Sequence, residues 1–326
     1  MEATPANGRK ITIIGAGSVG ATIAYAIMLR GLADEIVLVD KQDEKARAEA
    51  LDLRHGLLFA PATSVRAGKI SDAAGSAIVI ITAGAKQKPG QSRLDLAAAN
   101  KRMLAELVPA LVAAAPQAIL LMVTNPVDVL THIALEVSGL PERQVFGTGT
   151  VLDSSRFRYL IAEHLKIAVN NVHAYIVGEH GDSEVPLWSS ATVGNVSLDA
   201  LTIPGHPALV REDRARIFED VRTAAHQIIA AKGATNWAIG LASARVVEAI
   251  VRDENAILPV SRLLEDYHGI GDVCLSVLSV VSRAGVGPAL PLTLSEEELR
   301  LLRRSADVLK EIRRSISDGS ASSGTR

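Results

Sequence analysis

Short apolar runs alternate with helical patterns along the first half of this sequence. The runs are rich in Ile, Val and Leu, which is typical of strands buried on both faces of a parallel sheet. They span residues 11–14, 35–39, 77–81 and 118–123. Segments with apolar residues at helical spacing separate or follow them, at 18–30, 44–58, 94–115 and 127–138. This alternation predicts an α/β fold with a doubly wound parallel sheet.

The pattern changes near residue 150, where we predict a domain boundary. A strand is predicted at 172–177, and 272–282 alternates apolar and polar residues like an antiparallel strand with one wetter face. Helices are predicted at 212–232, at 242–252 and after a capping box of Ser295 and Glu298. We therefore expect a first domain over 10–150, a second, α+β domain over 151–317, and flexible polar ends at 1–9 and 318–326.

Composition and charge narrow the class of protein. The 326 residues suffice for about two domains. Lys and Arg number 34 and Asp and Glu 36, so the net charge of −2 gives no signature of binding to nucleic acid or to an anionic membrane. Cys274 is the only cysteine, which excludes an intrachain disulfide and a multi-thiolate zinc site and fits a reducing cytoplasm.

One stretch, 11–29, is long and uncharged enough to suggest a signal peptide or a membrane-spanning helix. Gly15, Gly17, Ser18 and Gly20 lie near its middle and would weaken a single helix. We therefore interpret the stretch as a buried strand, a turn and a helix, and we expect no membrane association.

The same glycines form the strongest local motif, Gly-Ala-Gly-Ser-Val-Gly at 15–20. In a dinucleotide-binding turn, Gly15 permits the tight turn, Gly17 lets a pyrophosphate approach the backbone, and Gly20 lets the helix pack on the strand. Asp40 ends the next predicted strand, where a carboxylate accepts both ribose hydroxyls and repels a 2′-phosphate. A glycine-rich turn beside a solvated Asp is the alternative. The pattern predicts a Rossmann-type, NAD-binding first domain.

Two further polar segments follow predicted strands, at the edge where open α/β sheets bind ligands. Residues 82–93 combine Gly, Pro and basic residues, which suits a lid that closes over a substrate and brings Arg93 with it. An ordinary solvated loop is the alternative. Asn125 follows the run at 118–123, where its amide suits a cofactor or substrate contact or a helix cap.

The second half contributes three charged residues of interest. Asp153 and Arg156 share one face of a predicted helix, as part of a site or as an exposed ion pair. His180 lies in a loop with glycines on both sides, where the backbone can approach a ligand, and this favours a functional His. A metal site is the weaker alternative, since no second His and no His-Glu-x-x-His helix accompany it. Its ligands would be Glu179, His180, Asp182 and Glu184.

Together these segments resemble the L-lactate/malate dehydrogenase family and, within it, the bacterial lactate branch. The matching motifs occur in order from about residue 10 to about residue 316. They lie at 15–20, 39–40, 87–90, 93–96, 124–128, 152–154, 156–158, 178–182 and 232–235. Several motifs in order are far more specific than any one of them.

The resemblance implies roles for the polar residues. His180 is expected as the acid/base, Asp153 as the carboxylate that orients it, and Arg93 as the lid residue that polarises the substrate carbonyl. The expected substrate contacts are Gln87, Arg93, Asn125, Asp153, Arg156 and Thr235. These residue types suit reduction of a 2-keto acid, because a His donates a proton near neutral pH and a guanidinium holds a carboxylate by two hydrogen bonds.

The resemblance also implies NAD as the cofactor, and we expect no metal. The expected cofactor contacts are Gly15, Gly17, Val19, Gly20, Asp40, Lys45, Gly84, Asn125 and Thr148. One departure from the family is Gln91, where a Glu is usual; it lies beside the lid and leaves every catalytic group in place.

Position 87 corresponds to the residue that reads the variable end of the substrate. Neutral Gln87 favours pyruvate and L-lactate, because the second carboxylate of oxaloacetate or L-malate would need a cation there. Malate dehydrogenase activity stays open as an alternative, since Lys86 and Lys88 flank Gln87 and a one-residue shift in register would reverse the expectation. A non-catalytic, redox-sensing protein that binds a dinucleotide is a second alternative. Such a protein would not need Arg93, Asp153, Arg156 and His180 together.

A cytoplasmic homotetramer is implied as well. Some bacterial members of the family are activated by fructose 1,6-bisphosphate at a subunit interface, and Arg158 and His173 match the residues that bind its phosphates. Relatives without this activation carry the same pair, so a surface ion site is the alternative.

Overall fold

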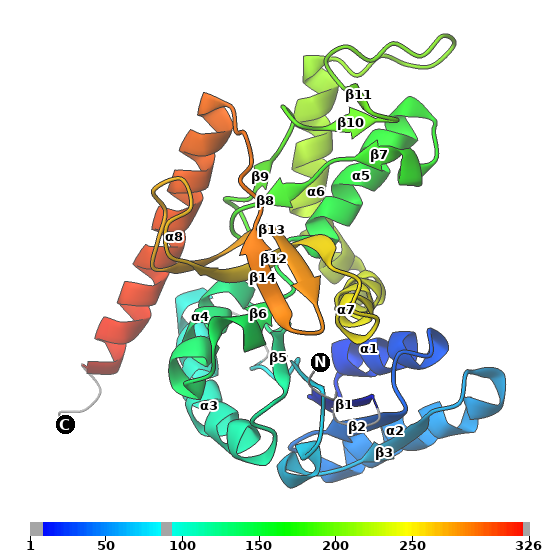
Figure 1. The fold of residues 1–326 in the computed structure, drawn as a ribbon, viewed down its shortest axis with the longest axis vertical. Coiled ribbons are helices and arrows are strands. Elements are labelled where there is room, and N and C mark those ends of the chain that lie inside the picture. Colours follow the sequence, from blue (N-terminus) through cyan, green and yellow to red (C-terminus); the bar gives the residue numbers. More distant parts are fainter. Residues whose placement is uncertain (1–8, 86–92, 322–326) are drawn as a thin grey trace, which may run out of the picture.

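A nine-stranded sheet runs through the molecule in the order β14-β13-β12-β6-β5-β4-β1-β2-β3 (Figure 1). The computed structural model describes residues 9–85 and 93–321, with the backbone alone for 93–96 and 317–321. The strands of this sheet are β1 (Lys10–Ile14), β2 (Glu35–Val39), β3 (Ser64–Ala67), β4 (Ile78–Ile81), β5 (Ile119–Met122), β6 (Val145–Gly147), β12 (Ala256–Leu264), β13 (Val273–Ser282) and β14 (Gly285–Ala289). The first six pair in parallel, and β12 continues the sheet antiparallel to β6, so both halves of the chain share one sheet.

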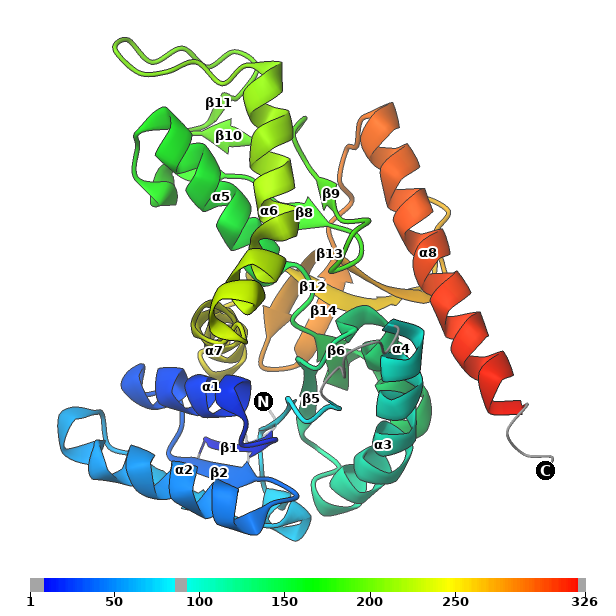
Figure 2. The same cartoon turned by 180° about the vertical axis from the view of Figure 1, so that it is seen from behind.

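Helices cover both faces of the sheet (Figure 2). They are α1 (Ser18–Leu29), α2 (Asp43–His55), α3 (Arg93–Ala114), α4 (Val127–Ser138), α5 (Val151–Leu165), α6 (Arg211–Lys232), α7 (Trp237–Val251) and α8 (Glu296–Ala321). Side chains of α1, α2 and α7 pack into one core, and those of α3, α4 and α8 into the other. Strand β1 shows the arrangement, since Ile11 and Ile13 enter the first core and Ile14 the second. Burial on both faces explains the unbroken apolar runs.

A separate lobe lies beyond the sheet, at the top of Figure 1. It consists of α5, α6 and the short strands β7 (Val172–His173), β10 (Thr192–Val193) and β11 (Val196–Ser197). Its own core includes Phe157, Ile161 and Ile217. Strands β8 (Ile176–Val177) and β9 (Val185–Pro186) pair with each other, and the chain between them carries the loop of residues 178–184.

The predicted elements are largely present. The four predicted parallel strands are β4, β5, β1 and β2, and residues 11–29 form a strand, a turn and α1 as expected. Within the described ranges, no helix is long and apolar enough to cross a membrane. The pattern missed β6, which has three residues, and β3, in which one residue is buried. Helix α7 begins at Trp237, before the predicted start, and α8 continues to Ala321, into the segment expected as a tail.

Two expectations for the second half are wrong. Residues 172–177 form two short strands in different sheets, β7 and β8, rather than one. Strand β13 has no wetter face, since Cys274 is 1% and Ser276 0% exposed. The reason is its position between β12 and β14 with α7 and α8 packed against it, so the small polar residues of the alternation are buried as well.

Candidate active site

The segment between β1 and α1 closes as a tight glycine turn at the carboxyl edge of the sheet. Gly15 has a φ of +105°, which favours glycine, and its N–H donates to the carbonyl of Val39 at 2.7 Å. A Cβ on Gly20 would lie 1.9 Å from the carbonyl oxygen of Gly15, so the turn and the helix touch backbone to backbone. A Cβ on Gly17 would meet nothing nearer than Lys45 Nζ at 3.8 Å, which leaves space for a phosphate at the N-terminus of α1.

Asp40 follows β2, and its carboxylate braces this turn. Oδ2 accepts the N–H of Ala16 at 2.8 Å, and Oδ1 accepts the N–H of Gln42 at 3.0 Å. Each carboxylate oxygen has two acceptor sites, so both can still accept a ribose hydroxyl. The contact with Ala16 distinguishes Asp40 from a merely solvated side chain.

The other expected cofactor contacts lie along the same edge of the sheet. A Cβ on Gly84 would lie 2.5 Å from the Thr124 methyl carbon, so a larger residue does not fit there. Asn125 comes after β5, and the residue that follows it, not Asn125 itself, occupies the N-cap of α4. Thr148 is buried just after β6, and Val19 packs half-buried against the core of α1 and α7.

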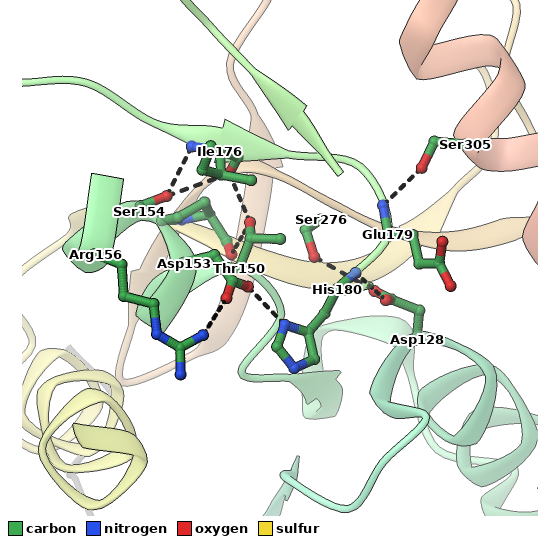
Figure 3. Close-up of polar contacts among 11 residues, drawn as sticks. Asp128, Thr150, Asp153, Ser154, Arg156, Ile176, Glu179, His180, Ser276 and Ser305 are labelled. Atoms are coloured by element: carbon green, nitrogen blue, oxygen red, sulfur yellow. Dashed lines mark hydrogen bonds and ion pairs between the residues drawn. The ribbon is translucent and has the colours of Figure 1, made fainter. Parts of the chain in front are cut away.

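Three charged side chains meet between α5 and the loop after β8 (Figure 3). Asp153 lies in the first turn of α5. Its Oδ2 lies 2.6 Å from His180 Nδ1, and its Oδ1 accepts a hydrogen bond from Arg156 Nη1 at 2.9 Å. The side chains of Asp153 and Arg156 are 3% and 15% exposed, so the alternative of an exposed ion pair is wrong.

The loop that carries His180 is also held through its backbone. The N–H of Glu179 donates to Ser305 Oγ of α8 at 2.8 Å, and the N–H of His180 donates to Asp128 Oδ2 of α4 at 2.8 Å. Ser276 Oγ of β13 donates to the other oxygen of Asp128 at 3.3 Å. Four elements distant in sequence, α4, α5, β13 and α8, therefore fix the position of one imidazole.

These contacts shift the protonation of the site. The negative charge of Asp153 raises the pKa of His180 to about 9, against the lowering effect of burial. Burial raises the pKa of Asp153 by itself, but His180 and Arg156 outweigh it and hold that pKa below its ordinary value. Burial raises the pKa of Asp128 to about 6 and that of Glu184 to about 9. At neutral pH, His180 is therefore an imidazolium paired with an ionised Asp153.

This arrangement suits proton donation beside a bound carboxylate. Figure 3 shows that the ring nitrogen of His180 that does not face Asp153 is directed away from it, where a ligand can receive its proton. Arg156 presents a planar guanidinium, which binds carboxylates by two parallel hydrogen bonds. Among the side chains that the structure describes, no three of His, Cys, Asp or Glu are placed to hold a metal ion.

The predicted lid lies mostly outside the described residues. Gln87 and Gln91, together with Lys86 and Lys88, belong to the segment 86–92. Arg93 is the first residue of α3, for which the backbone alone is described at this end. The roles of Gln87 and Arg93 therefore stay predictions.

Three more predicted residues lie farther along the chain. Thr235 is half-buried in the loop between α6 and α7, which Asn236 pins to α1 by a hydrogen bond to Thr22 Oγ1 at 3.0 Å. Arg158 lies on α5, and its buried Nε has no hydrogen-bond partner in the described part of the chain. His173 is exposed on β7, which packs against α5. Arg158 and His173 thus lie on adjacent elements of one lobe.

Sequence reasoning gave no role to Asp128, Ser276 or Ser305, although all three hold the His180 loop. Asp128 offered a weak signal, since it follows Asn125 by three residues within a matching motif, but an acid in the first turn of a helix is common. The two serines offered none, because their contacts with the loop exist only once the sheet and α8 are assembled.

Comparisons with known proteins agree with this architecture. The family model described as lactate/malate dehydrogenase, NAD binding domain, matches residues 9–147, and the one described as lactate/malate dehydrogenase, alpha/beta C-terminal domain, matches 150–319. An L-lactate dehydrogenase of Bifidobacterium animalis subsp. lactis is 49% identical over 313 residues, covering 95% of this chain and 98% of the relative. One of Acetivibrio thermocellus is 48% identical over 304 residues, covering 93% and 96%.

Two solved structures are similar over nearly the whole chain. One is MGS-M5, a lactate dehydrogenase enzyme from a Medee basin deep-sea metagenome library, with a TM-score of 0.90 and 38% identity over 95% of this chain and 99% of that one. The other is the minor L-lactate dehydrogenase from Enterococcus mundtii in a ligands-bound form, with a TM-score of 0.91 and 39% identity over 95% and 98%.

Proposed function

The chain belongs to the lactate/malate dehydrogenase family, and from this premise we propose that it is an NAD-dependent L-lactate dehydrogenase that interconverts pyruvate and L-lactate. The observation that carries the proposal is the Asp153 carboxylate, which lies 2.6 Å from His180 Nδ1 and 2.9 Å from Arg156 Nη1. One buried carboxylate thereby orients a proton donor and a carboxylate-binding cation toward the same small ligand.

NAD fits the turn after β1, and when bound it supplies the hydride for the carbonyl carbon. We assign the pyrophosphate to residues 15–20, where Gly17 has nothing within 3.8 Å of a Cβ and Lys45 adds a positive charge. Asp40 is assigned to the adenosine ribose, since one of its oxygens contacts the turn through the Ala16 N–H while the other accepts the N–H of Gln42.

The chain's own residues then carry out the proton transfer. In pyruvate reduction, His180 starts as an imidazolium and donates its proton to the carbonyl oxygen, while Asp153 stabilises the charged ring and fixes its orientation. Arg156 holds the substrate carboxylate by two hydrogen bonds. Arg93 polarises the carbonyl once the lid has excluded water. L-Lactate oxidation runs the same steps backward, with neutral His180 as the base.

Substrate choice rests on Gln87, with Asn125 and Thr235 as further substrate contacts. A second carboxylate opposite Gln87 would be desolvated without a cation, which costs several kcal/mol, whereas a methyl group carries no such penalty. Oxaloacetate reduction remains the alternative, because Lys86 and Lys88 flank that position.

The test is an assay of the purified protein with NADH and either pyruvate or oxaloacetate, alongside Gln87→Arg. We expect a higher kcat/KM for pyruvate in the unmodified protein and a reversed preference in the variant, since a guanidinium pairs with the second carboxylate. Lys86→Ala and Lys88→Ala serve as controls and should change the ratio only modestly. A preference of the unmodified protein for oxaloacetate supports the malate alternative, and turnover of neither substrate supports the non-catalytic one.

We further propose that the protein is a cytoplasmic homotetramer. The subunit exposes large apolar side chains on α1, on the single-turn helix η1 (Leu57–Phe59) and on α7. They include Phe59, Leu58, Trp237 and Leu241 at 82%, 86%, 64% and 61% exposure. Helices α1 and α7 pack against each other, and a contiguous apolar patch exposed on one subunit is typical of a protein–protein interface. Sedimentation equilibrium tests the assembly, and a monomeric mass would contradict it.

Fructose 1,6-bisphosphate is the proposed effector, with Arg158 and His173 as its phosphate contacts. The proposal is supported by the Nε of Arg158, which has no hydrogen-bond partner among the described residues, and by the exposure of His173 on the adjacent strand. Titrating the sugar bisphosphate against the initial rate at low pyruvate tests it. A rise that Arg158→Ala abolishes is expected, and a flat response would leave both residues as a surface ion site.

A further inference from the structure

We propose that Asp128 is a positioning residue for His180, which it holds through the backbone amide while Asp153 holds the ring. The inference rests on the function proposed above, since it concerns the proton donor of that reaction. Asp128 lies in the first turn of α4, and its side chain is almost fully buried, with the residue 2% exposed.

The contacts of Asp128 form a closed ring of hydrogen bonds. Its Oδ2 accepts the His180 N–H at 2.8 Å, and its Oδ1 accepts the Ser276 hydroxyl at 3.3 Å. The backbone of Ser276 in turn pairs with that of Gly178, at 2.9 and 3.1 Å, two residues before His180. Helix α4, strand β13 and the His180 loop are therefore locked together at one carboxylate.

Asp128 also connects His180 to the start of α4, where another proposed ligand contact lies. Asn125, a proposed contact of both cofactor and substrate, lies three residues before Asp128, where α4 begins. A displacement of this end of α4 is transmitted to His180 through one hydrogen bond of 2.8 Å. Proton transfer is sensitive to displacements of about 1 Å. The hydrogen bond therefore keeps His180 at a fixed distance from Asn125, the proposed contact at the start of α4.

An amide could make both hydrogen bonds, yet the residue is an acid in a site where burial disfavours its charge. Burial raises the pKa of Asp128 to about 6, so above that pH it is ionised beside the imidazolium of His180. Its charge then adds to that of Asp153 in favouring the protonated ring. We infer that Asp128 supports both the position and the protonation of His180.

Other charged groups face these residues from each neighbouring element. Asp153 and Arg156 do so from α5 and Glu179 and Glu184 from the loop, while Arg222 of α6 faces Glu184 and the Cys274 thiol of β13 lies near Asp128. Burial and the charge of Asp153 raise the pKa of Glu184 to about 9, so it is neutral at pH 7. Of the acids facing the ring, Asp128 and Asp153 are the two that hydrogen-bond to His180.

The experiment compares Asp128→Asn with Asp128→Ala and with Ser305→Ala. Asparagine keeps the acceptor oxygen but removes the charge, and alanine removes both. Ser305→Ala is the matched control, because it removes a neutral side-chain anchor from the amide of Glu179, one residue away, at the same distance of 2.8 Å. The readouts are the pH profile of kcat/KM for pyruvate, kcat itself, and NADH binding by fluorescence titration.

We expect Asp128→Asn to retain kcat at pH 7 within about threefold and to move the alkaline limb of the profile downward by roughly 0.5 to 1 pH unit. Asp128→Ala should lower kcat about 10- to 100-fold with little change in NADH affinity. Ser305→Ala should leave the alkaline limb in place.

If the alkaline limb of Asp128→Asn stays in place, the charge of Asp128 does not support the protonation of His180. If the limb moves by the same amount in Ser305→Ala, Asp128 only helps to pack the loop. If Asp128→Ala fails to fold, the Asp128→Asn profile still decides. Failure of the proposed function is separate, since it appears as absent pyruvate turnover in the unmodified protein.

Discussion

The glycine turn after β1 and the cluster around His180 have complementary roles in the proposed reaction but are built in opposite ways. The turn is one contiguous segment, and its geometry depends on missing side chains: a Cβ on Gly20 would lie 1.9 Å from the carbonyl oxygen of Gly15. The cluster brings together Asp128, Asp153 and His180 from three distant segments, and it depends on buried polar contacts of 2.6 and 2.8 Å. Substitutions should therefore damage the turn through sterics and the cluster through charge and hydrogen bonding.

The clearest test of this contrast is a variant that loses turnover but still binds NADH at the glycine turn. His180→Asn should lower kcat for pyruvate roughly 10³-fold, because the proton donor is lost. NADH affinity should stay unchanged, since the turn after β1 is separate from the His180 loop. Stopped-flow kinetics and fluorescence titration of NADH measure the two quantities. Turnover close to that of the unmodified protein would contradict the role of His180.

Asp153→Asn tests the charge within the cluster. Pyruvate reduction requires protonated His180, and Asp153 raises the pKa of His180 to about 9, so the rate should be kept through neutral pH and lost as pH rises through about 9. The variant should lose roughly 10²-fold in kcat, and its alkaline limb should move toward the ordinary His value. A pH profile of kcat/KM measures both. An unmoved limb would show that Asp153 does not set the protonation of His180.

Two glycine variants test the opposite construction of the turn. Gly20→Ala places a methyl group against the backbone of Gly15, so we expect a lower Tm and at least tenfold weaker NADH binding. Apart from its chain neighbours, a Cβ on Gly17 meets nothing in the described part of the chain nearer than Lys45 Nζ at 3.8 Å. Gly17→Ala should therefore keep the Tm and weaken NADH binding alone. Calorimetry and fluorescence titration separate the effects. Equal loss of Tm in both variants would contradict the steric account.

Asp40→Ser tests whether a negative charge beside the turn determines the preference for NAD over NADP. Removal of the carboxylate takes away repulsion of a 2′-phosphate, so the preference for NAD over NADP, as a ratio of kcat/KM, should fall about tenfold. NADH affinity should fall modestly as well, because the bond from the Ala16 N–H at 2.8 Å is weakened. Equal use of both cofactors by the unmodified protein would refute the assignment of Asp40.

The same difference in construction decides what the sequence could predict. The turn was readable because strand, glycines, helix and Asp40 follow one another within about 30 residues, each with its own local signal. His180, Asp153 and Arg156 were identified through ordered motifs, but their contact depends on how α5 meets the loop after β8. The role of Asp128 could not be predicted, because it depends on a hydrogen bond to the backbone of His180 that forms only in the folded protein. Likewise β13 was misjudged, since burial of its small polar residues depends on α7 and α8.

Glu184 offers the smallest and most discriminating test of the cluster. It is 6% exposed, and its Oε1 has no hydrogen-bond partner in the part of the chain that the structure describes. Burial, reinforced by the charge of Asp153, raises its pKa from an ordinary 4.5 to about 9. Between these values the folded protein holds a proton that the unfolded chain releases, so this residue makes the protein less stable as pH rises. Glu184→Gln is neutral at every pH and removes that dependence.

We therefore expect the Tm of Glu184→Gln to exceed that of the unmodified protein by a few degrees at pH 8 and to match it near pH 5. Differential scanning calorimetry at the two pH values measures this. Glu106→Gln, at an exposed acid of α3, is the matched control and should show little difference between them. A Tm gain for Glu184→Gln of equal size at both pH values would mean that a difference in packing, and not the buried proton, causes the effect. The cluster around His180 would then accept an ionised Glu184 at little cost in stability.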